Sequence, residues 1–296
     1  MLVEIDRHSG FCGGVIRAIG NAEKFLQENG GTLYSLGAIV HNEEELSRLQ
    51  SMGLETLDKD DLDRMVDTRG KTLLIRAHGE PPQVYAKAEN KGFTVIDCTC
   101  PVVLKLQKDI CSAYENVKAG DGTVVLFGKI GHPEVLGLVG QVGGDVLVVE
   151  NVAQLDARLE AGELRTDRDI ELFSQTTMSP VAYMELCHHL EVYMKGDARL
   201  NVHDTICSQM SSRHKELSEF AIGHDVIVFV SGKESSNGKV LCELCRSCNI
   251  RTFHIGSVSE LQSSWFGKDD KVGVCGATST PKWLLEQVAQ AIENMQ

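Results

Sequence analysis

The sequence lacks a surplus of basic residues, a long apolar run and an apolar signal core. Its formal net charge is −13 and it has no long basic run, which disfavours general nucleic-acid binding. No apolar stretch is long enough to cross a bilayer, and residues 1–10 are charged, so we expect no membrane contact and a cytoplasmic location. The acidic balance does not exclude an anionic substrate, because local donors govern a pocket.

Cysteine, in contrast, is plentiful, with ten residues in a chain of 296. In a reducing compartment these are more commonly thiols or metal ligands than a disulfide framework. Three of them, Cys12, Cys100 and Cys207, each lie between a short apolar strand and an amphipathic helix. The predicted strands are Leu2–Ile5, Phe93–Ile96 and Arg199–Val202, and the predicted helices are Val15–Leu26, Val102–Val117 and Ser211–Ala221.

The segment after each cysteine repeats one order of elements. A second strand (Tyr34–Val40, Thr123–Phe127, Asp225–Val230) ends in a polar tip 29, 32 or 28 residues after the cysteine. A final strand (Leu73–Ile75, Ile170–Phe173, Val272–Val274) ends in another polar tip. Because spacing and element type recur together, the sequence predicts three copies of one α/β unit.

The ends of parallel strands are where such units bind ligands, because loops and helix N-termini present N–H groups there. All six polar tips and all three cysteines follow predicted strands. If the units pack around a pseudo-threefold axis, these motifs meet at one cavity. Three cysteines that hold three irons of a 4Fe-4S cluster leave the fourth iron open as a Lewis acid for a hydroxyl oxygen. Any one of these cysteines alone is more commonly a small buried apolar residue.

Nine short motifs occur in order along nearly the whole chain. They are Gly10-Phe11-Cys12-Gly13-Gly14-Val15, Val40-His41-Asn42, Ala77-His78-Gly79, Asp97-Cys98-Thr99-Cys100-Pro101, Gly131-His132-Pro133-Glu134-Val135, Gln175-Thr176-Thr177, Thr205-Ile206-Cys207, Ser235-Ser236-Asn237 and Ser279-Thr280-Pro281. This ordered set resembles the 4-hydroxy-3-methylbut-2-enyl diphosphate reductase family, IspH/LytB.

The resemblance implies an α/β fold of three pseudo-symmetric domains with small, mostly parallel sheets, arranged as a trefoil around a central iron-sulfur cluster. The expected boundaries are 13–100 for the first unit, with 1–12 packing centrally, 101–203 for the second and 204–280 for the third, followed by a C-terminal helix over 281–296.

The resemblance also implies an activity. The family reductively dehydrates (E)-4-hydroxy-3-methylbut-2-enyl diphosphate to isopentenyl and dimethylallyl diphosphate, the last step of the non-mevalonate (MEP) pathway. Cys12, Cys100 and Cys207 would bind a 4Fe-4S cluster whose open iron receives the substrate hydroxyl. The two electrons would come from an external donor such as ferredoxin or flavodoxin.

Glu134 is the residue that the resemblance favours as proton donor to the departing hydroxide. A carboxyl group in a closed, low-dielectric cavity beside anions has a raised pKa and holds a proton near neutrality. Thr176 would orient it, Thr177 would assist, and His132 would relay protons. Pro133 also indicates a helix start, where a glutamate is favoured by the helix dipole alone.

The diphosphate of the substrate would lie among histidine, hydroxyl and amide groups. Histidine supplies a charged or neutral donor, and helix N-termini add backbone N–H groups, so no lysine-rich loop is required. Each histidine alone is more commonly structural, and the assignment depends on the combination. The expected set is His41, His78, His132, Thr176, Thr177, Ser235, Ser236, Asn237 and Ser279.

The sequence departs from the family pattern at three places. Cys98 stands where alanine is usual and competes with Cys100 as a ligand; we choose Cys100 because it directly precedes Pro101 and the helix. Arg76 stands where serine is common and would either add charge near the diphosphate or face solvent. The last tip begins Cys275-Gly276-Ala277, which leaves its loop conformation open although Ser279 is kept.

The Cys-x-x-Cys-x-x-Cys run of Cys242, Cys245 and Cys248 suggests a second cluster or a zinc site. It follows Ser-Ser-Asn where the other units start a helix, which favours a helix with thiols on its packed face. Cys111, Cys187 and Cys275 are interpreted as buried or incidental thiols.

Two other functions remain open from sequence alone. An iron-sulfur hydro-lyase would use the same open iron without net reduction, and a non-enzymatic iron-sulfur carrier or sensor would need no proton donor. The set of diphosphate-binding residues favours the reductase over both.

Overall fold

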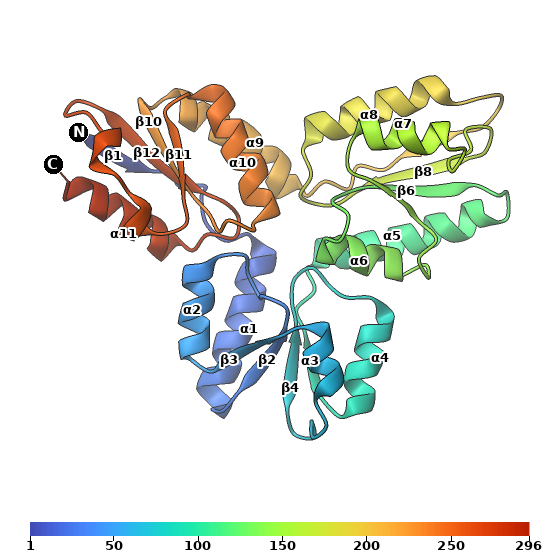
Figure 1. The fold of residues 1–296 in the computed structure, drawn as a ribbon, viewed down its shortest axis with the longest axis horizontal. Helices are drawn as coiled ribbons and strands as arrows, with labels where there is room; N and C mark the ends of the chain where they lie inside the picture. Colours follow the sequence, from blue (N-terminus) through green and yellow to red (C-terminus); the bar gives the residue numbers. More distant parts are fainter. Residues whose placement is uncertain (296) are drawn as a thin grey trace. The chain divides into compact units, whose positions relative to one another are not determined.

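The computed structural model describes residues 1–295 as alternating strands and helices, which confirms the α/β class (Figure 1). The chain divides into two compact units: unit 1 contains residues 1–65, 71–76 and 208–296, and unit 2 contains residues 66–70 and 77–207. The predicted domain boundaries stay a prediction, and Gln296, the end of the predicted C-terminal helix, lies outside the described residues. Within the described chain, no helix is both long and apolar enough to span a bilayer.

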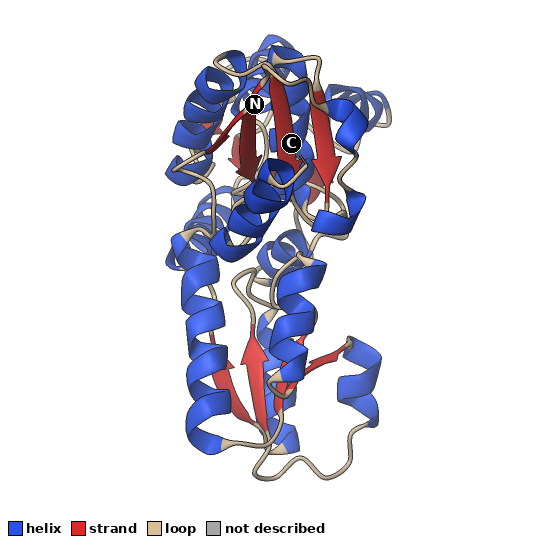
Figure 2. Cartoon of the chain, turned by 90° about the vertical axis from the view of Figure 1, so that its left-hand side faces the viewer, coloured by secondary structure: helices blue, strands red, loops and turns tan. Residues whose placement is uncertain are grey.

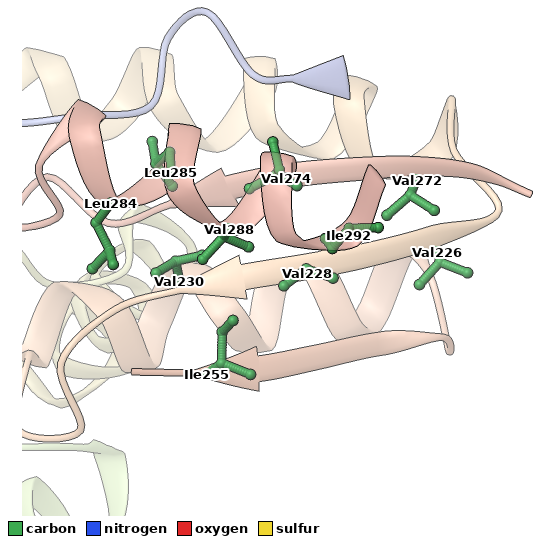
Figure 3. Close-up of a cluster of buried hydrophobic side chains, with 11 residues drawn as sticks. Val226, Val228, Val230, Ile255, Val272, Val274, Leu284, Leu285, Val288 and Ile292 are labelled. Carbon is green, nitrogen blue, oxygen red and sulfur yellow. The ribbon is translucent and has the colours of Figure 1, made fainter. Parts of the chain in front are cut away.

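One four-stranded sheet joins the two ends of the chain. Its order is β1 (Leu2–Ile5), β12 (Lys271–Gly276), β10 (Val226–Val230) and β11 (Thr252–Ile255). Helices α9 (Ser208–Ile222), α10 (Ser236–Cys248) and α11 (Lys282–Glu293) pack against these strands, and two short 3-10 helices, η1 (Val258–Glu260) and η2 (Ser263–Trp265), follow β11. Figure 3 shows the core between α11 and the sheet, where Leu285 and Val288 lie over Val228, Val230 and Val274.

A second sheet has the order β3 (Leu54–Leu57), β2 (Leu33–Leu36), β4 (Thr72–Ile75) and β5 (Thr94–Asp97). The helices of this part are α1 (Gly13–Asn29), which packs on β2, α2 (Glu43–Ser51) and α3 (Lys59–Arg64), which pack on β3, and α4 (Pro82–Lys91), which packs on β5. Side-chain caps fix the helix starts: Asn42 accepts from the N–H of Glu45, and Asp58 and Asp61 form a capping box.

The third sheet has the order β7 (Leu147–Val149), β6 (Thr123–Phe127), β8 (Ile170–Ser174) and β9 (Leu200–Val202). Helices α5 (Pro101–Lys118), α6 (Pro133–Gly140), α7 (Val152–Glu160) and α8 (Pro180–Tyr193) accompany it. Figure 2, in which helices are blue and strands red, shows helices beside strands in the part of the chain that faces the viewer, where both termini lie. Three of these helices begin with proline, whose fixed φ suits the first helical position and whose missing N–H is not needed there.

Two sheets share one strand order, second-first-third-fourth along the chain, and the sheet of β10, β11 and β12 has the same order when β1 is counted as its fourth strand. In each sheet this fourth strand leads to a cysteine. β5 precedes Cys100, β9 precedes Cys207, and β1, which pairs with β12 in the register Leu2 to Lys271, precedes Cys12. The predicted strand-cysteine-helix order is therefore confirmed. The strand before each cysteine completes the sheet of the preceding repeat, and β1 does so for the last one.

Strand β10 is a continuous apolar run, as expected for a parallel strand covered on both faces. All five residues of β10, Val226–Val230, are buried. One predicted strand was too long: β2 ends at Leu36 instead of Val40, because Gly37 adopts φ +75° and turns the chain. A Cβ at Gly37 would also lie 2.5 Å from the guanidinium carbon of Arg76, so the position requires glycine twice over.

Candidate active site

The predicted site residues lie at the carboxyl ends of strands and form two sets, one in each unit. Unit 1 carries Cys12, His41, Ser235, Ser236, Asn237 and Ser279, and unit 2 carries His78, Cys100, His132, Glu134, Thr176, Thr177 and Cys207.

The three cysteines have the same local setting. The backbone N–H of Cys12 donates to the carbonyl of Thr278 at 3.0 Å, that of Cys100 to Ala77 at 3.0 Å, and that of Cys207 to Thr176 at 2.9 Å. Each acceptor belongs to the polar tip after the third strand of a sheet. Cys12 and Cys100 are the N-cap residues of α1 and α5, and Cys207 directly precedes α9. The backbone of each cysteine is thus held by the loop after the third strand of a sheet.

The three thiols fit the ligand chemistry of an iron-sulfur cluster, which is held by cysteine thiolates. Cys12, Cys100 and Cys207 are all half-buried. Cys98, the competitor of Cys100, is 0% exposed and packs in the core just after β5. This contrast favours Cys100 as the ligand from this turn.

Glu134 lies in the first turn of α6, where Pro133 starts the helix, and only 2% of it is exposed. Burial raises the pKa of Glu134 from 4.5 to about 6, although two hydrogen bonds from Thr176 oppose the shift. The structure therefore contains a carboxyl group that holds a proton closer to neutrality than an exposed glutamate does, as the sequence predicts.

Thr176 connects this acid to a cysteine. Its backbone N–H and its hydroxyl each donate to the Glu134 carboxylate at 2.8 Å, and its carbonyl accepts the N–H of Cys207. The expected contact between Thr176 and Glu134 is therefore present. Thr177 is held separately by the buried Gln175, whose Nε2 donates to the Thr177 hydroxyl at 3.2 Å.

His132 is the N-cap of α6, and its Nδ1 accepts the backbone N–H of Glu134 at 3.2 Å. An accepting Nδ1 carries no proton, so the neutral ring carries its proton on Nε2 and can donate from there. The ring of His78 meets it edge to face, with 5.2 Å between the centroids. Two histidines, Glu134 and Thr176 thus gather within unit 2.

In unit 1, the tips after β10 and β12 are bonded to each other. The hydroxyls of Ser235 and Ser279 lie 3.0 Å apart, and Ser235 also caps α10 by accepting the N–H of Gly238. Ser236 is the first residue of α10 and is half-buried. These groups present hydroxyls at a helix N-terminus, where anions are favoured.

Two further contacts fix neighbours of this hydroxyl pair. Asn237 Oδ1 accepts both the N–H and the hydroxyl of Thr278, at 3.0 and 2.9 Å, so the Asn237 amide holds the loop that receives Cys12. The carbonyl of His41 lies so close to Gly232 that a Cβ there would stand 2.3 Å from its oxygen. His41, Ser235, Asn237 and Ser279 therefore come from loops that touch.

The alternative that Arg76 faces solvent is wrong, because the residue is 9% exposed and its Nη1 donates to the carbonyl of Ala38 at 3.3 Å. It thereby supports the turn that leads to His41. Sequence reasoning missed Gly232, because a glycine carries no motif of its own, and it named Gln175 within a motif without assigning it a role.

The three cysteines of the Cys-x-x-Cys-x-x-Cys run lie on α10, as predicted, and Cys242 and Cys245 are buried in its packed face. Burial raises the pKa of the Cys242 thiol to about 11, which disfavours the thiolate that a metal requires. Residues 1–295 contain no assembled group of three histidine, cysteine or acidic side chains for a metal ion, so the cluster at Cys12, Cys100 and Cys207 stays a prediction.

The buried Glu134 should make stability depend on pH. Folding favours its protonated form, so its contribution to stability is fully present below pH 4.5 and is lost as the pH rises through about 6. We predict that, as the pH rises through this window, the free energy of unfolding of the wild type falls by about 2 kcal/mol relative to that of Glu134→Gln. Urea denaturation at each pH measures both. The matched control is Glu185→Gln at an exposed position of α8, and parallel pH curves for wild type and Glu134→Gln would contradict the prediction.

Known proteins are similar to this chain over nearly its whole length. The model of the LytB protein family matches residues 3–293. A relative from Parabacteroides distasonis named 4-hydroxy-3-methylbut-2-enyl diphosphate reductase is 46% identical, over 99% of this chain and 98% of its own. Another of that name, from Bacteroides thetaiotaomicron, is 45% identical over 98% and 97%.

Two solved structures are similar as well. The structure of (E)-4-hydroxy-3-methyl-but-2-enyl diphosphate reductase, described as the terminal enzyme of the non-mevalonate pathway, aligns with a TM-score of 0.70 at 32% identity, over 99% of this chain and 100% of its own. The E-1-hydroxy-2-methyl-but-2-enyl-4-diphosphate reductase from Plasmodium falciparum aligns with a TM-score of 0.84 at 25% identity, over 98% and 87%. The chain belongs to the LytB family.

Proposed function

We propose that this protein catalyses the reductive dehydration of (E)-4-hydroxy-3-methylbut-2-enyl diphosphate to isopentenyl and dimethylallyl diphosphate, the last step of the non-mevalonate pathway. Full-length relatives that carry the name of this reductase support the proposal. The reaction removes the allylic hydroxyl as water and consumes two electrons and two protons. It therefore needs an electron source, a proton donor and a diphosphate site.

One observation carries the proposal: Thr176 bonds the buried acid Glu134 through its N–H and hydroxyl and bonds the backbone of Cys207 through its carbonyl. A single residue thus fixes a proton donor next to a residue that we expect to bind metal. A protein that only stores or senses electrons has no use for this arrangement, since it moves no proton to a substrate.

The proposed metal ligands are Cys12, Cys100 and Cys207. When bound, a 4Fe-4S cluster supplies the electrons and an open iron of Lewis-acid character. An external donor such as ferredoxin or flavodoxin and a cytoplasmic location belong to the same proposal.

Glu134 would protonate the departing hydroxide. Its pKa of about 6 leaves a useful fraction protonated near neutrality, and an anionic diphosphate nearby would increase that fraction. The Thr176 hydroxyl donates to the ionised carboxylate and is able to accept from the protonated form, so it orients the carboxyl group in both states. The Nε2–H of His132 is suited to bring in the next proton.

The diphosphate would be bound by His41, His78 and His132 with the hydroxyls of Ser235, Ser236, Thr177 and Ser279 and the amide of Asn237. These donors lie at the starts of α2, α6 and α10 or in loops beside them, where backbone N–H groups add to the attraction for an anion. An iron-sulfur hydro-lyase remains the second candidate, because it would use the same acid.

The reductase is distinguished from both alternatives by its electron demand. We expect the anaerobically reconstituted protein to oxidise reduced viologen only when the allylic diphosphate is added, with two viologens oxidised for each product formed. Oxidation is followed by absorbance and the products by mass spectrometry. Conversion of the substrate without loss of reduced viologen would indicate a hydro-lyase. No conversion at all would indicate a non-enzymatic iron-sulfur carrier or sensor.

Substitution of Glu134 by glutamine should lower turnover without loss of the bound cluster. Glu134→Gln keeps the size and the hydrogen bonds of the side chain but has no transferable proton, so we expect turnover to fall about 100-fold or more while cluster absorbance is kept. Glu185→Gln should match the wild type in both measurements. Turnover of Glu134→Gln near the wild-type rate would remove Glu134 as the proton donor.

Substitution of the two cysteines of the Asp97–Pro101 turn should have different effects on the amount of bound iron and sulfide. Iron and sulfide counts should fall in Cys100→Ser, because a half-buried thiol is lost from the ligand set, and should stay at the wild-type value in Cys98→Ser. The reverse pattern would assign the ligand to Cys98.

A further inference from the structure

A buried ion pair in unit 1 has no part in the proposed reaction. Nη1 of Arg213 on α9 lies 2.5 Å from Oδ2 of Asp6, the residue after β1, and the two side chains are 5% and 3% exposed. A buried ion pair is a poor way to gain stability, because desolvation of both charges offsets their attraction. Its presence therefore calls for another physical reason.

Ser9 joins this ion pair to the end of β12. Its hydroxyl donates to Asp6 Oδ2 at 2.8 Å and accepts from Arg213 Nη2 at 2.5 Å and from the N–H of Gly276 at 2.8 Å. Arg213 Nη2 also lies 3.3 Å from the Gly276 carbonyl. A hydroxyl has one donor and two acceptor positions, and all three of Ser9 are used; the shorter donor contact is to Asp6, since the Gly276 carbonyl lies 3.4 Å away.

The network holds both sides of the turn that carries Cys12. On one side, Ser9 is three residues before Cys12, and Gly10 between them adopts φ +130°. On the other side, Gly276 is two residues before Thr278, whose carbonyl accepts the Cys12 N–H at 3.0 Å. The Cys12 backbone thus lies between two loops. The Arg213–Asp6 ion pair and the Ser9 hydroxyl hold these loops together.

We propose that Arg213, Asp6 and Ser9 are positioning residues that fix the Cys12 thiol as a metal ligand. The inference rests on the proposed cluster, since it assigns these residues a role only toward that group. Residues that orient a ligand in this way alter metal affinity by about 10- to 100-fold when removed. Residues that serve stability alone would not change metal retention in the folded protein.

The test is iron release from the anaerobically reconstituted protein into an excess of a ferrous chelator. We expect Ser9→Ala, which leaves the ion pair in place, and Arg213→Met to release iron about 10-fold faster than the wild type, with a changed electron paramagnetic resonance spectrum of the reduced protein. Arg213→Lys keeps the charge but not the forked contact to Ser9 and Gly276. It should therefore release iron faster than the wild type and more slowly than Arg213→Met.

Matched controls come from the same unit. Arg251→Met removes an Arg–Asp ion pair to Asp270, and Ser218→Ala removes a hydroxyl from α9 that donates to the His214 carbonyl. Both should release iron at the wild-type rate. The unfolding transition of each apoprotein reports whether the variant is folded, and if Arg213→Met does not fold, Ser9→Ala decides the question.

Folded Ser9→Ala with the wild-type release rate and spectrum would overturn this inference and leave the proposed function intact. A wild-type protein that takes up no cluster would overturn both. Faster release in the controls as well would also overturn the inference, because it would show that iron retention follows general stability rather than the Cys12 turn.

Discussion

The constraint on which the rest of the structure depends is the hydrogen bond from the backbone N–H of each proposed cysteine ligand to a carbonyl in the loop after a third strand. It occurs three times, at Cys12, Cys100 and Cys207, with nearly equal lengths. In two of the sheets the strand before the cysteine pairs in parallel with the strand before the accepting carbonyl, β1 with β12 and β9 with β8, so their carboxyl ends face the same way. The bond fixes the thiol at an edge where the loops already present hydroxyls, amides and a carboxyl group.

Opposing effects set the pKa of Glu134. Burial of Glu134 favours the neutral carboxyl, whereas the two bonds from Thr176 favour the carboxylate, and burial is the larger effect. The net result is an acid that can both hold and release a proton near physiological pH. A fully apolar pocket would hold the proton too tightly to give it up, and an exposed glutamate would have lost it before the substrate arrived.

Much of this was predictable because it is local. The cysteine turns and the helix starts at Pro101 and Pro133 follow from short motifs and their recurrence. The contact between Glu134 and Thr176 joins residues far apart in the sequence and was expected only from the family resemblance. The pairing of β1 with β12 was not predicted, since it joins residues 2 and 271 and leaves no periodic signal. Asp6 and Arg213 were missed for a related reason: a charged residue after a strand or on a helix resembles a surface residue until the fold buries it.

The pairing of the first strand with the last one also bears on how the protein is made. β1 leaves the ribosome long before its partner β12 exists, and during that time its edge is unpaired. Its strand is short and carries Glu4 and then Asp6, charges that discourage pairing with other chains while it waits. The turn at Cys12 takes its final form only after β12 and the loop that carries Thr278 have been synthesised, so loading of the proposed cluster at this residue would come late.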